Sequence, residues 1–227
     1  MNISILCPTR GRPLRFAEMA SSAIKLAEDP NEIEILAYLD ADDPKVKEYP
    51  ELPRVSYFCG PRVTVSRAFN VLYEDASSDI VMSGADDLIF RTPKWDTEVT
   101  KAFALNRASL VVPLDGVEDK RGRRTTHFFA SREWVDLVGY FLPEEYEHFY
   151  SDTHLEDIAL RAKAMVWLDT VLVEHMHPNH GKAVRDSTYD DKRRVTANGR
   201  MSERDGIRFG QLAEARALAA DRIRSAA

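Results

Sequence analysis

The stretch ISILCPTRGRP, residues 3–13, indicates how the fold begins. Its first five residues, 3–7, are apolar enough to form a strand that is covered on both faces of a parallel sheet. A polar turn follows, and Pro13 then opens a helix, because proline is favoured in a first helical turn. A strand, a polar turn and a helix in this order are typical of a layered α/β fold.

The same order repeats through the first two thirds of the chain. Three more apolar runs predict strands at 33–39, 54–58 and 79–83, and three- and four-residue spacing of apolar residues predicts helices at 14–27 and 65–76. Further strands are expected at 110–113, 125–130 and 170–173, and further helices at 132–140 and 155–166. We therefore expect an α/β fold whose mostly parallel central sheet is flanked by helices.

The last fifth of the chain has a different composition. Residues 175–201 are polar, with glycine and proline and little periodicity, which predicts a flap longer than an ordinary connection. Ser202 followed by Asp205 resembles a capping box, and apolar residues from Phe209 to Ile223 then give a C-terminal helix one apolar face. This divides the chain into a main domain, 1–180, and a flap with a helix, 181–227. The helix needs a partner, either its own core or a second subunit in a homodimer.

Composition limits the classes of protein to consider. The chain has 227 residues, of which 44% are hydrophobic and 30% charged, enough for one sizeable core. A formal net charge of -6 gives no overall reason to expect binding to nucleic acid or to a membrane surface. Two cysteines are too few for a disulfide scaffold, and no apolar run predicts a membrane span or a signal peptide. We expect a cytoplasmic protein that does not bind membranes.

Charged residues follow each of the first four predicted strands. The four segments are Pro8-Thr9-Arg10-Gly11-Arg12, Asp40-Ala41-Asp42-Asp43, Gly60-Pro61-Arg62 and Gly84-Ala85-Asp86-Asp87. In open α/β sheets, ligands bind beyond the carboxyl ends of the strands, where such segments converge. Two segments are rich in arginine and two in aspartate, which suits an anionic ligand together with a divalent cation.

Five motifs in this order resemble the inverting family 2 glycosyltransferases of the GT-A fold. They are the run at 3–13, Asp40, the segment Arg67-Ala68-Phe69-Asn70, Asp86-Asp87, and Glu156-Asp157 with the later His175-Met176-His177. Within the family, the small soluble phage-encoded members are the most similar. The resemblance covers residues 1–180 and implies that they form a Rossmann-like domain that binds a nucleotide sugar and catalyses transfer.

The resemblance implies a donor site. Thr9 and Arg10 would lie against the nucleotide, Asp40 would bond the base, usually uracil, and Arg67 would face the diphosphate. The full set of expected donor-binding residues is Pro8, Thr9, Arg10, Arg12, Asp40, Arg62, Arg67, Asp86 and, from the flap, Lys182. A flap of this kind would exclude water from the donor.

Asp86 and Asp87 are the expected metal-binding motif. The family often has an aspartate two positions before the metal ligand, whereas Gly84 and Ala85 precede Asp86 here. This leaves either Asp86 or Asp87 as the direct ligand, and we favour Asp87. Carboxylates and an imidazole suit Mn²⁺ or Mg²⁺, of which manganese tolerates a nitrogen ligand better. His177 is the expected third ligand, with His175 and His180 as competitors.

Inversion requires a carboxylate that accepts the proton of the attacking hydroxyl. The family places this base at the start of a helix, and Asp157 holds that position in the helix expected at 155–166. Glu156 is the immediate alternative. A structural ion pair between Asp157 and Arg161, one helical turn later, is the competing interpretation.

Two other functions share some of these features. A sugar nucleotidyltransferase needs a glycine-rich loop after the first strand, which the lone Gly11 does not supply; a non-catalytic sugar-nucleotide-binding module needs no catalytic acid. For a transferase, the acceptor is a protein, a small glycan or hydroxymethylated bases in phage DNA. Basic clusters favour DNA: Lys120-Arg121-Gly122-Arg123-Arg124, and Lys192-Arg193-Arg194 with Arg200.

Overall fold

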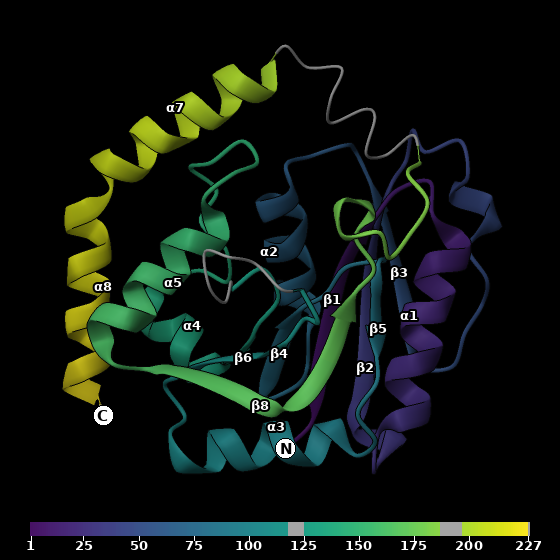
Figure 1. Ribbon diagram of the computed structural model, residues 1–227, viewed down its shortest axis with the longest axis horizontal. Helices are drawn as coiled ribbons and strands as arrows, with labels where there is room; N and C mark the ends of the chain where they lie inside the picture. The colour runs from purple at the N-terminus through teal and green to yellow at the C-terminus, as the bar shows by residue number, and fades with distance from the viewer. Residues whose placement is uncertain (118–124, 187–196, 227) are drawn as a thin grey trace.

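The computed structural model describes residues 1–117, 125–186 and 197–226, without the side chains of 179 and 197–200. One sheet of eight strands runs through the molecule in the order β3-β2-β1-β4-β7-β6-β8-β5 (Figure 1). Four strands, β1 (Ile3–Thr9), β2 (Ile33–Asp40), β3 (Val55–Gly60) and β4 (Ile80–Ser83), are mutually parallel where they pair. Their carboxyl ends therefore share one edge.

The other half of the sheet is mixed. Strand β7 (Phe129–Ser131) pairs antiparallel with β4 and with β6 (Leu110–Leu114). Strand β8 (Met165–His175) runs parallel to β6, and the three-residue β5 (Leu88–Phe90) pairs antiparallel with its last residues. The chain thus leaves β4, passes through the Asp86-Asp87 turn and at once meets His175, which is opposite Leu88.

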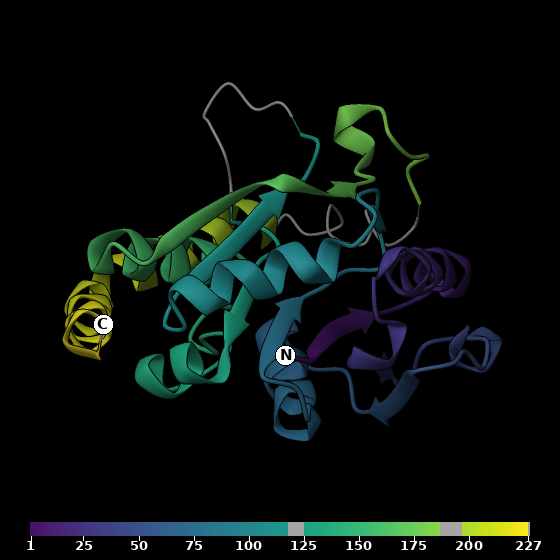
Figure 2. The ribbon, with the colours of Figure 1, turned by 90° about the horizontal axis from the view of Figure 1, so that it is seen from below.

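Helices cover both faces of the sheet (Figures 1 and 2). Helices α1 (Pro13–Leu26) and α3 (Trp95–Leu105) pack on one face, where they share a core with Ile3, Ile5 and Cys7. Helices α2 (Val65–Asp75), α4 (Arg132–Val138), α5 (Ser151–Ala162) and α8 (Ala213–Ala226) share the core on the other face with Leu6. Successive residues of a strand point to opposite faces of the sheet. Because both faces are covered by helices, nearly every residue of β1 has to be apolar.

Local sequence sets the helix ends. Thr64 and Ser131 accept the backbone N–H of Arg67 and Trp134 at 3.3 and 3.1 Å, and so cap the first turns of α2 and α4. Helix α5 lies between Tyr150 and Lys163, whose backbones are left-handed with φ of 69° and 57°. The left-handed Lys163 ends the helix and lets the chain turn into β8.

The α/β prediction is confirmed, and several element boundaries are wrong. The helix expected at 155–166 spans Ser151–Ala162, while residues 165 and 166 begin β8. The strand expected at 125–130 is confined to Phe129–Ser131, and α3 and β5 were not expected. Ser202 is not a helix cap, because α7 (Ala197–Gln211) already contains it, and the chain bends before α8 (Figure 1).

Helix α8 belongs to the main core. Ala219, Ala220 and Ile223 are buried in the same cluster as Leu155 and Ile158 of α5. The apolar face of α8 is thus covered by the chain's own core, which was one of the two expected partners. The homodimer stays a prediction. The boundary proposed at residue 180 is not marked by a separate core. None of the helices in the described parts of the chain is long and apolar enough to cross a membrane.

Candidate active site

The ends of β1 and β4 are joined by a hydrogen bond. Thr9 Oγ1 donates to Asp86 Oδ2 at 2.7 Å and lies 3.1 Å from the hydroxyl of Tyr49. Pro8, one residue earlier, lies inside β1 opposite Tyr38 of β2. Gly84 allows this close approach, because a Cβ at Gly84 would lie 2.8 Å from the carbonyl oxygen of Leu6. The structure therefore explains why glycine, not aspartate, stands two positions before Asp86; it gives no such reason for Ala85, two positions before Asp87.

Asp40 lies close to two arginines that follow neighbouring strands. Arg10 Nη1 lies 3.0 Å from Asp40 Oδ2, and Arg62 Nε lies 4.0 Å from the same oxygen. Arg10 also pairs with Asp42, whose pKa is lowered chiefly by that hydrogen bond. Three residues expected to bind the donor, Arg10, Asp40 and Arg62, therefore form one cluster.

Arg12 connects the acidic motif to the segment after β8. Its side chain is only 6% exposed, and Nη1 lies 2.8 Å from Asp86 Oδ1 and 3.7 Å from Asp87 Oδ2. Its Nε and Nη2 donate to the two carboxylate oxygens of Asp186 at 2.9 and 2.8 Å. This forked geometry is the one in which arginine binds carboxylates and phosphates.

Asp86 and Asp87 are both buried, with 6% and 7% exposure. Burial raises the pKa of Asp86, Arg12 opposes that shift, and the neighbouring Asp87 adds to it, so the pKa stays above its usual value. Burial and the adjacent Asp87 therefore outweigh the effect of Arg12 on the pKa of Asp86. A site of this kind favours a second cation.

Four histidines form a row beside Asp87. His175 Nε2 lies 3.5 Å from Asp87 Oδ1, and the ring of His175 packs edge-on against His127 and His177 at centroid distances of 4.9 and 5.2 Å. His180 lies 5.8 Å beyond His177. Burial and the nearby His175 lower the pKa of His127 to about 4.

The expected metal ligands therefore lie in one region, but the histidine that faces Asp87 is His175 and not the expected His177. His175 faces Asp87 at the distance given above, whereas His177 packs edge-on against His175. Among the residues that the structure describes, no group of three or more His, Cys, Asp or Glu side chains is placed so that it could hold a metal ion. The ligand role of His177 stays a prediction.

Two expected donor contacts are engaged elsewhere. Arg67 Nη1 lies 3.3 Å from Glu144, in the loop between α4 and α5, and its side chain is 49% exposed. Lys182 Nζ pairs with Glu174 at 2.7 Å and donates to the carbonyl of Gly116 at 2.6 Å. The donor-binding role of both side chains stays a prediction.

Asp157, the expected catalytic base, lies in a structural ion-pair network. Arg216 of α8, which is 3% exposed, donates from Nε to Asp157 Oδ2 at 2.7 Å, and Arg161 does so at 2.9 Å. Burial raises the pKa of Asp157, but the hydrogen bonds from Arg216 and Arg161 outweigh it and lower the pKa. Because α5 begins at Ser151, Asp157 also lies in its second turn and not at its start.

Two other acids of α5 have different surroundings. Asp152 stands in the first turn, where its Oδ1 accepts the backbone N–H of Thr153 at 2.7 Å. Glu156 accepts a hydrogen bond from Thr125 Oγ1 at 2.8 Å. Thr125 is two residues before His127. Of these three acids, Asp157 is the one that pairs with an arginine of α8 within the described part of the chain.

The C-terminal helices hold the loop that leads into α5. Asp205 of α7 is 2% exposed and accepts the backbone N–H groups of Glu147, His148 and Phe149 at 3.0, 3.0 and 2.8 Å. His154 lies between the hydroxyls of Tyr140 and Tyr146 at 2.7 and 2.8 Å, and burial, with Arg216, lowers its pKa to about 4. These hydrogen bonds hold the backbone just before Ser151, the first residue of α5.

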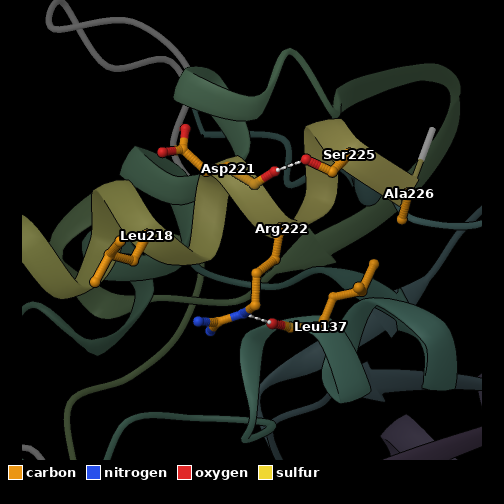
Figure 3. Close-up of a pocket in the computed structure, with 6 residues that line it drawn as sticks. All are labelled: Leu137, Leu218, Asp221, Arg222, Ser225 and Ala226. Atoms are coloured by element: carbon orange, nitrogen blue, oxygen red, sulfur yellow. Dashed lines mark hydrogen bonds between the residues drawn. The ribbon is translucent and has the colours of Figure 1, made fainter.

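A separate pocket of about 500 Å³ lies between α4 and α8 (Figure 3). It is lined by Leu137, Leu218, Asp221, Arg222, Ser225 and Ala226. Arg222 Nε donates to the carbonyl of Leu137 at 2.6 Å and so satisfies the last turn of α4. None of the expected site residues contributes to this pocket.

Sequence reasoning did not single out Tyr49, His127, Asp152 or Asp186, and it placed Asp205 in a capping box that the structure does not form. Asp152 carried the same signal as Asp157, an acid at a helix start, but the start was misplaced. The others lie in segments without a recognised motif. The basic clusters at 120–124 and 192–194 lie outside the described residues, as does the side chain of Arg200.

No protein-family model and no curated protein sequence matches this chain. Solved structures do match it. TarS 1–349 of S. aureus in complex with UDP aligns with a TM-score of 0.63 and 12% identity, over 76% of this chain and 59% of TarS 1–349. In the complex with UDP-GlcNAc the TM-score is 0.61 and the identity 14%, over 82% and 62%.

An archaeal protein is similar to the same degree. The mannosyltransferase PcManGT of Pyrobaculum calidifontis, in complex with GDP-Man and Mn²⁺, aligns with a TM-score of 0.63 and 13% identity, over 78% of this chain and 57% of that one. These matches confirm the GT-A fold. The chain spans less than two thirds of the length of these relatives.

Proposed function

We propose that this protein is a metal-dependent inverting glycosyltransferase, similar to family 2, that moves a sugar from a nucleoside-diphosphate sugar to a hydroxyl group. The single observation that supports this best is the cluster of Thr9, Arg12, Asp86, Asp87 and His175 at the carboxyl ends of the strands. It lies where open α/β sheets bind ligands, in the fold of proteins solved with UDP and with GDP-Man.

Different strand ends bind different parts of the donor. Asp40, between Arg10 and Arg62, is suited to the base and ribose, with UDP as the favoured nucleotide. Arg12 offers a forked guanidinium to the diphosphate, since Asp186 occupies that fork with the same geometry that a phosphate would use. Asp86 and Asp87 supply the charge that a cation needs.

The types of residue at the acidic motif suit a divalent cation, and the described structure places no three of them so that they could hold one. Two adjacent buried carboxylates with an imidazole 3.5 Å away form a donor set that suits Mn²⁺, with Mg²⁺ as the weaker alternative. When bound, the cation neutralises negative charge on the departing diphosphate. Asp87 would hold it, while Asp86 is fixed by Thr9 and Arg12 on the nucleotide side.

Transfer is a single displacement. The bond between the anomeric carbon and the diphosphate oxygen breaks, the diphosphate leaves with the electron pair, and the acceptor oxygen forms the new bond on the opposite face. The acceptor proton passes to a carboxylate. Asp157 and Glu156 were the expected bases. We favour Asp152, because it stands in the first turn of α5 while two arginines hold Asp157.

The decisive experiment measures donor use. UDP, UDP-sugars and GDP-sugars are titrated by calorimetry with Mn²⁺, and release of nucleoside diphosphate is then measured with a panel of hydroxyl acceptors. We expect UDP binding, release that stops with a chelator and returns with Mn²⁺, and a product whose anomeric configuration is inverted by NMR. Pyrophosphate release from UTP and a sugar phosphate would indicate a nucleotidyltransferase instead. Binding without any release would indicate a non-catalytic module.

The acceptor is proposed separately. Hydroxymethylated bases in phage DNA follow only from the basic clusters at 120–124 and 192–194 and from the resemblance to phage-encoded members. We expect transfer to hydroxymethylated DNA to weaken with salt, and more so in wild type than after Arg123, Arg124, Arg193 and Arg194 are replaced by alanine. Without salt-sensitive DNA binding, a protein or small glycan becomes the acceptor.

A further inference from the structure

We propose that Tyr49 is a positioning residue of the donor site, whose hydroxyl holds Thr9 and Arg12 in place for a nucleoside diphosphate. Tyr49 lies in the loop between β2 and β3, outside every motif that predicted the site. The inference rests on the proposed function in taking the bound ligand to be a nucleoside diphosphate.

The Tyr49 hydroxyl belongs to a closed series of hydrogen bonds at the end of β1. It lies 3.1 Å from Thr9 Oγ1, and it accepts the backbone N–H of Arg12 at 3.4 Å. Thr9 Oγ1 in turn donates to Asp86 Oδ2 at 2.7 Å. Arg12 Nη1 donates to the other oxygen of Asp86, Oδ1, at 2.8 Å. The series therefore starts at the backbone of Arg12 and returns to its side chain.

The direction of each hydrogen bond follows from the groups involved. A carboxylate oxygen only accepts, so the single hydroxyl hydrogen of Thr9 points to Asp86. The hydrogen of Tyr49 is then the one that points to Thr9 Oγ1, while the Tyr49 oxygen accepts the N–H of Arg12. Hydrogen bonds that are aligned in one direction strengthen one another. Tyr49 is thus the link that joins the backbone of Arg12 to Thr9 and Asp86.

The ring of Tyr49 is held by packing. Its centroid lies 5.9 Å from that of Phe16 in α1 and 6.2 Å from that of Tyr57 in β3, both in edge-on geometry. The hydroxyl of Tyr57 donates to the carbonyl of Pro50 at 2.6 Å, which fixes the residue next to Tyr49. Burial raises the pKa of Tyr49 to about 12, so its hydroxyl keeps the hydrogen at neutral pH.

A second side chain of the same loop holds the same turn. Asp43 is 3% exposed, and its Oδ2 accepts the backbone N–H of Gly11 at 2.7 Å. Its Oδ1 accepts the backbone N–H of Lys45 at 2.9 Å, which ties Asp43 to its own loop. Gly11 has a φ of 72°, in the left-handed region that favours glycine. Asp43 and Tyr49 therefore fix two successive amide groups, those of Gly11 and Arg12.

These two amides lie between the side chains that are proposed to bind the two ends of the donor. Arg10 Nη1 lies 3.0 Å from Asp40, at the proposed base site, and Arg12 lies against Asp86, at the proposed diphosphate site. A ligand that spans both sites needs a fixed spacing between them, because misplacement by about 1 Å is costly. The Tyr49 hydroxyl maintains this spacing through Thr9 and Arg12.

The test measures nucleotide affinity and turnover separately. Tyr49→Phe keeps the ring and removes the hydroxyl. Tyr57→Phe is the matched control, because it removes a hydroxyl from the same aromatic group that bonds to Pro50 instead. By calorimetry we expect Tyr49→Phe to bind UDP about three- to tenfold more weakly, the loss typical of one hydrogen bond. KM for a UDP-sugar should rise by the same factor and kcat change by less than about twofold. Tyr57→Phe should change neither.

Two further readouts distinguish positioning from a general structural role. In a Thr9→Val background, which lacks the next link, Tyr49→Phe should weaken UDP binding by less than about twofold, because both changes break the same series. In Thr9→Ser, which keeps the link, Tyr49→Phe should have its full effect. The Arg12 amide should exchange its hydrogen faster in Tyr49→Phe than in wild type or Tyr57→Phe, as measured by NMR. If Thr9→Val does not fold, Thr9→Ala replaces it.

The outcomes separate this inference from the proposed function. Wild-type UDP affinity in Tyr49→Phe, an equal loss in Tyr57→Phe, or a full effect of Tyr49→Phe in Thr9→Val would overturn the inference, even if sugar transfer is found. Unfolding of Tyr49→Phe by circular dichroism would do the same. Weaker UDP binding in Tyr49→Phe alone, in a protein that transfers no sugar, would support the inference and overturn the glycosyltransferase. GDP replaces UDP throughout if wild type binds only GDP, and if it binds neither, both proposals are wrong.

Discussion

Asp86-Asp87 and Glu156-Asp157 look alike in the sequence, as two acidic residues beside a regular element, but they have opposite surroundings. Asp86 and Asp87 share the one guanidinium of Arg12 and are buried beside imidazoles, and the pKa of Asp86 is raised. Asp157 is hydrogen-bonded by two arginines, and its pKa is lowered. The pKa values of Asp86 and Asp157 are therefore shifted in opposite directions by their surroundings.

The comparison also separates two parts of the molecule. The strand ends of β1 to β4 form a polar edge suited to a ligand. Helices α5, α7 and α8 form a frame in which Arg216 contacts Asp157 and also lies over the ring of Phe209, at 3.6 Å from the ring centroid. Similar residue types thus lie at the proposed binding site in one part and in an ion-pair network in the other.

The largest effect should come from the acidic motif. Asp87→Asn removes the charge that holds the cation and should lower turnover by about a thousandfold, since metal stabilisation of a leaving diphosphate contributes several kcal/mol. Calorimetry should show weak UDP binding that no longer responds to Mn²⁺. Full activity of Asp87→Asn in chelator-treated buffer would remove the metal assignment.

The next effect tests which acid of α5 is the base. Asp152→Asn should lower turnover by about a hundredfold or more and leave donor affinity nearly unchanged. Asp157→Asn should change turnover by less than about threefold once the protein is folded. Glu156→Gln completes the series. If Asp157→Asn loses turnover while keeping stability, the original prediction of Asp157 as base is restored.

For the free energy of unfolding the order of the two variants should be reversed, with a larger effect of Asp157→Asn than of Asp152→Asn. Asp157→Asn leaves the buried Arg216 without its carboxylate and should reduce the free energy of unfolding by about 2 kcal/mol, less than for a fully buried pair because Asp157 is partly exposed. The midpoint of thermal unfolding should fall by roughly 4–8 °C. Asp152→Asn, in the first turn, is the control and should shift the midpoint by no more than about 2 °C. Equal shifts would contradict the distinction.

The pH dependence of stability probes the same frame. The pKa of His154 is about 4 in the folded protein, against an ordinary value of about 6.5 in the unfolded chain. As pH falls from 6.5 to 4, the unfolded chain takes up a proton that folded His154 does not, so the free energy of unfolding decreases. His154→Gln should lose this part of the decrease in chemical denaturation at several pH values. An unchanged slope would show that His154 is not the group responsible.

The smallest effect concerns Asp186, which occupies the fork of Arg12. Asp186→Asn frees the guanidinium for a diphosphate and should tighten UDP binding about three- to tenfold, as expected for one partly exposed charge contact. Glu28→Gln, which breaks an exposed pair with Lys94, is the control and should have no effect. Weaker binding in Asp186→Asn would mean that Asp186 helps to hold the donor.

The four parallel strands and the residues at their ends could be predicted because each signal is local. An apolar run, the polar turn after it and a helix with a three- to four-residue period are adjacent in the chain, and a parallel sheet brings such ends to one edge. Strand β5 was not predicted because it has three residues, too few to show an alternating pattern. The end of helix α5 was misplaced because Lys163 ends it with a left-handed backbone that no motif marks.

The sequence alone therefore determined the α/β class, the polar edge and the acidic motif at Asp86-Asp87. The tertiary structure decided which charges are available for a ligand. Arg216 is 59 residues from Asp157, Asp186 is 174 from Arg12, and His127 is 44 from Ser83, and none of these contacts has a local signal. The physical reason is that burial and long-range partners set the charge and hydrogen-bonding state of a side chain, and both depend on residues that only folding brings together.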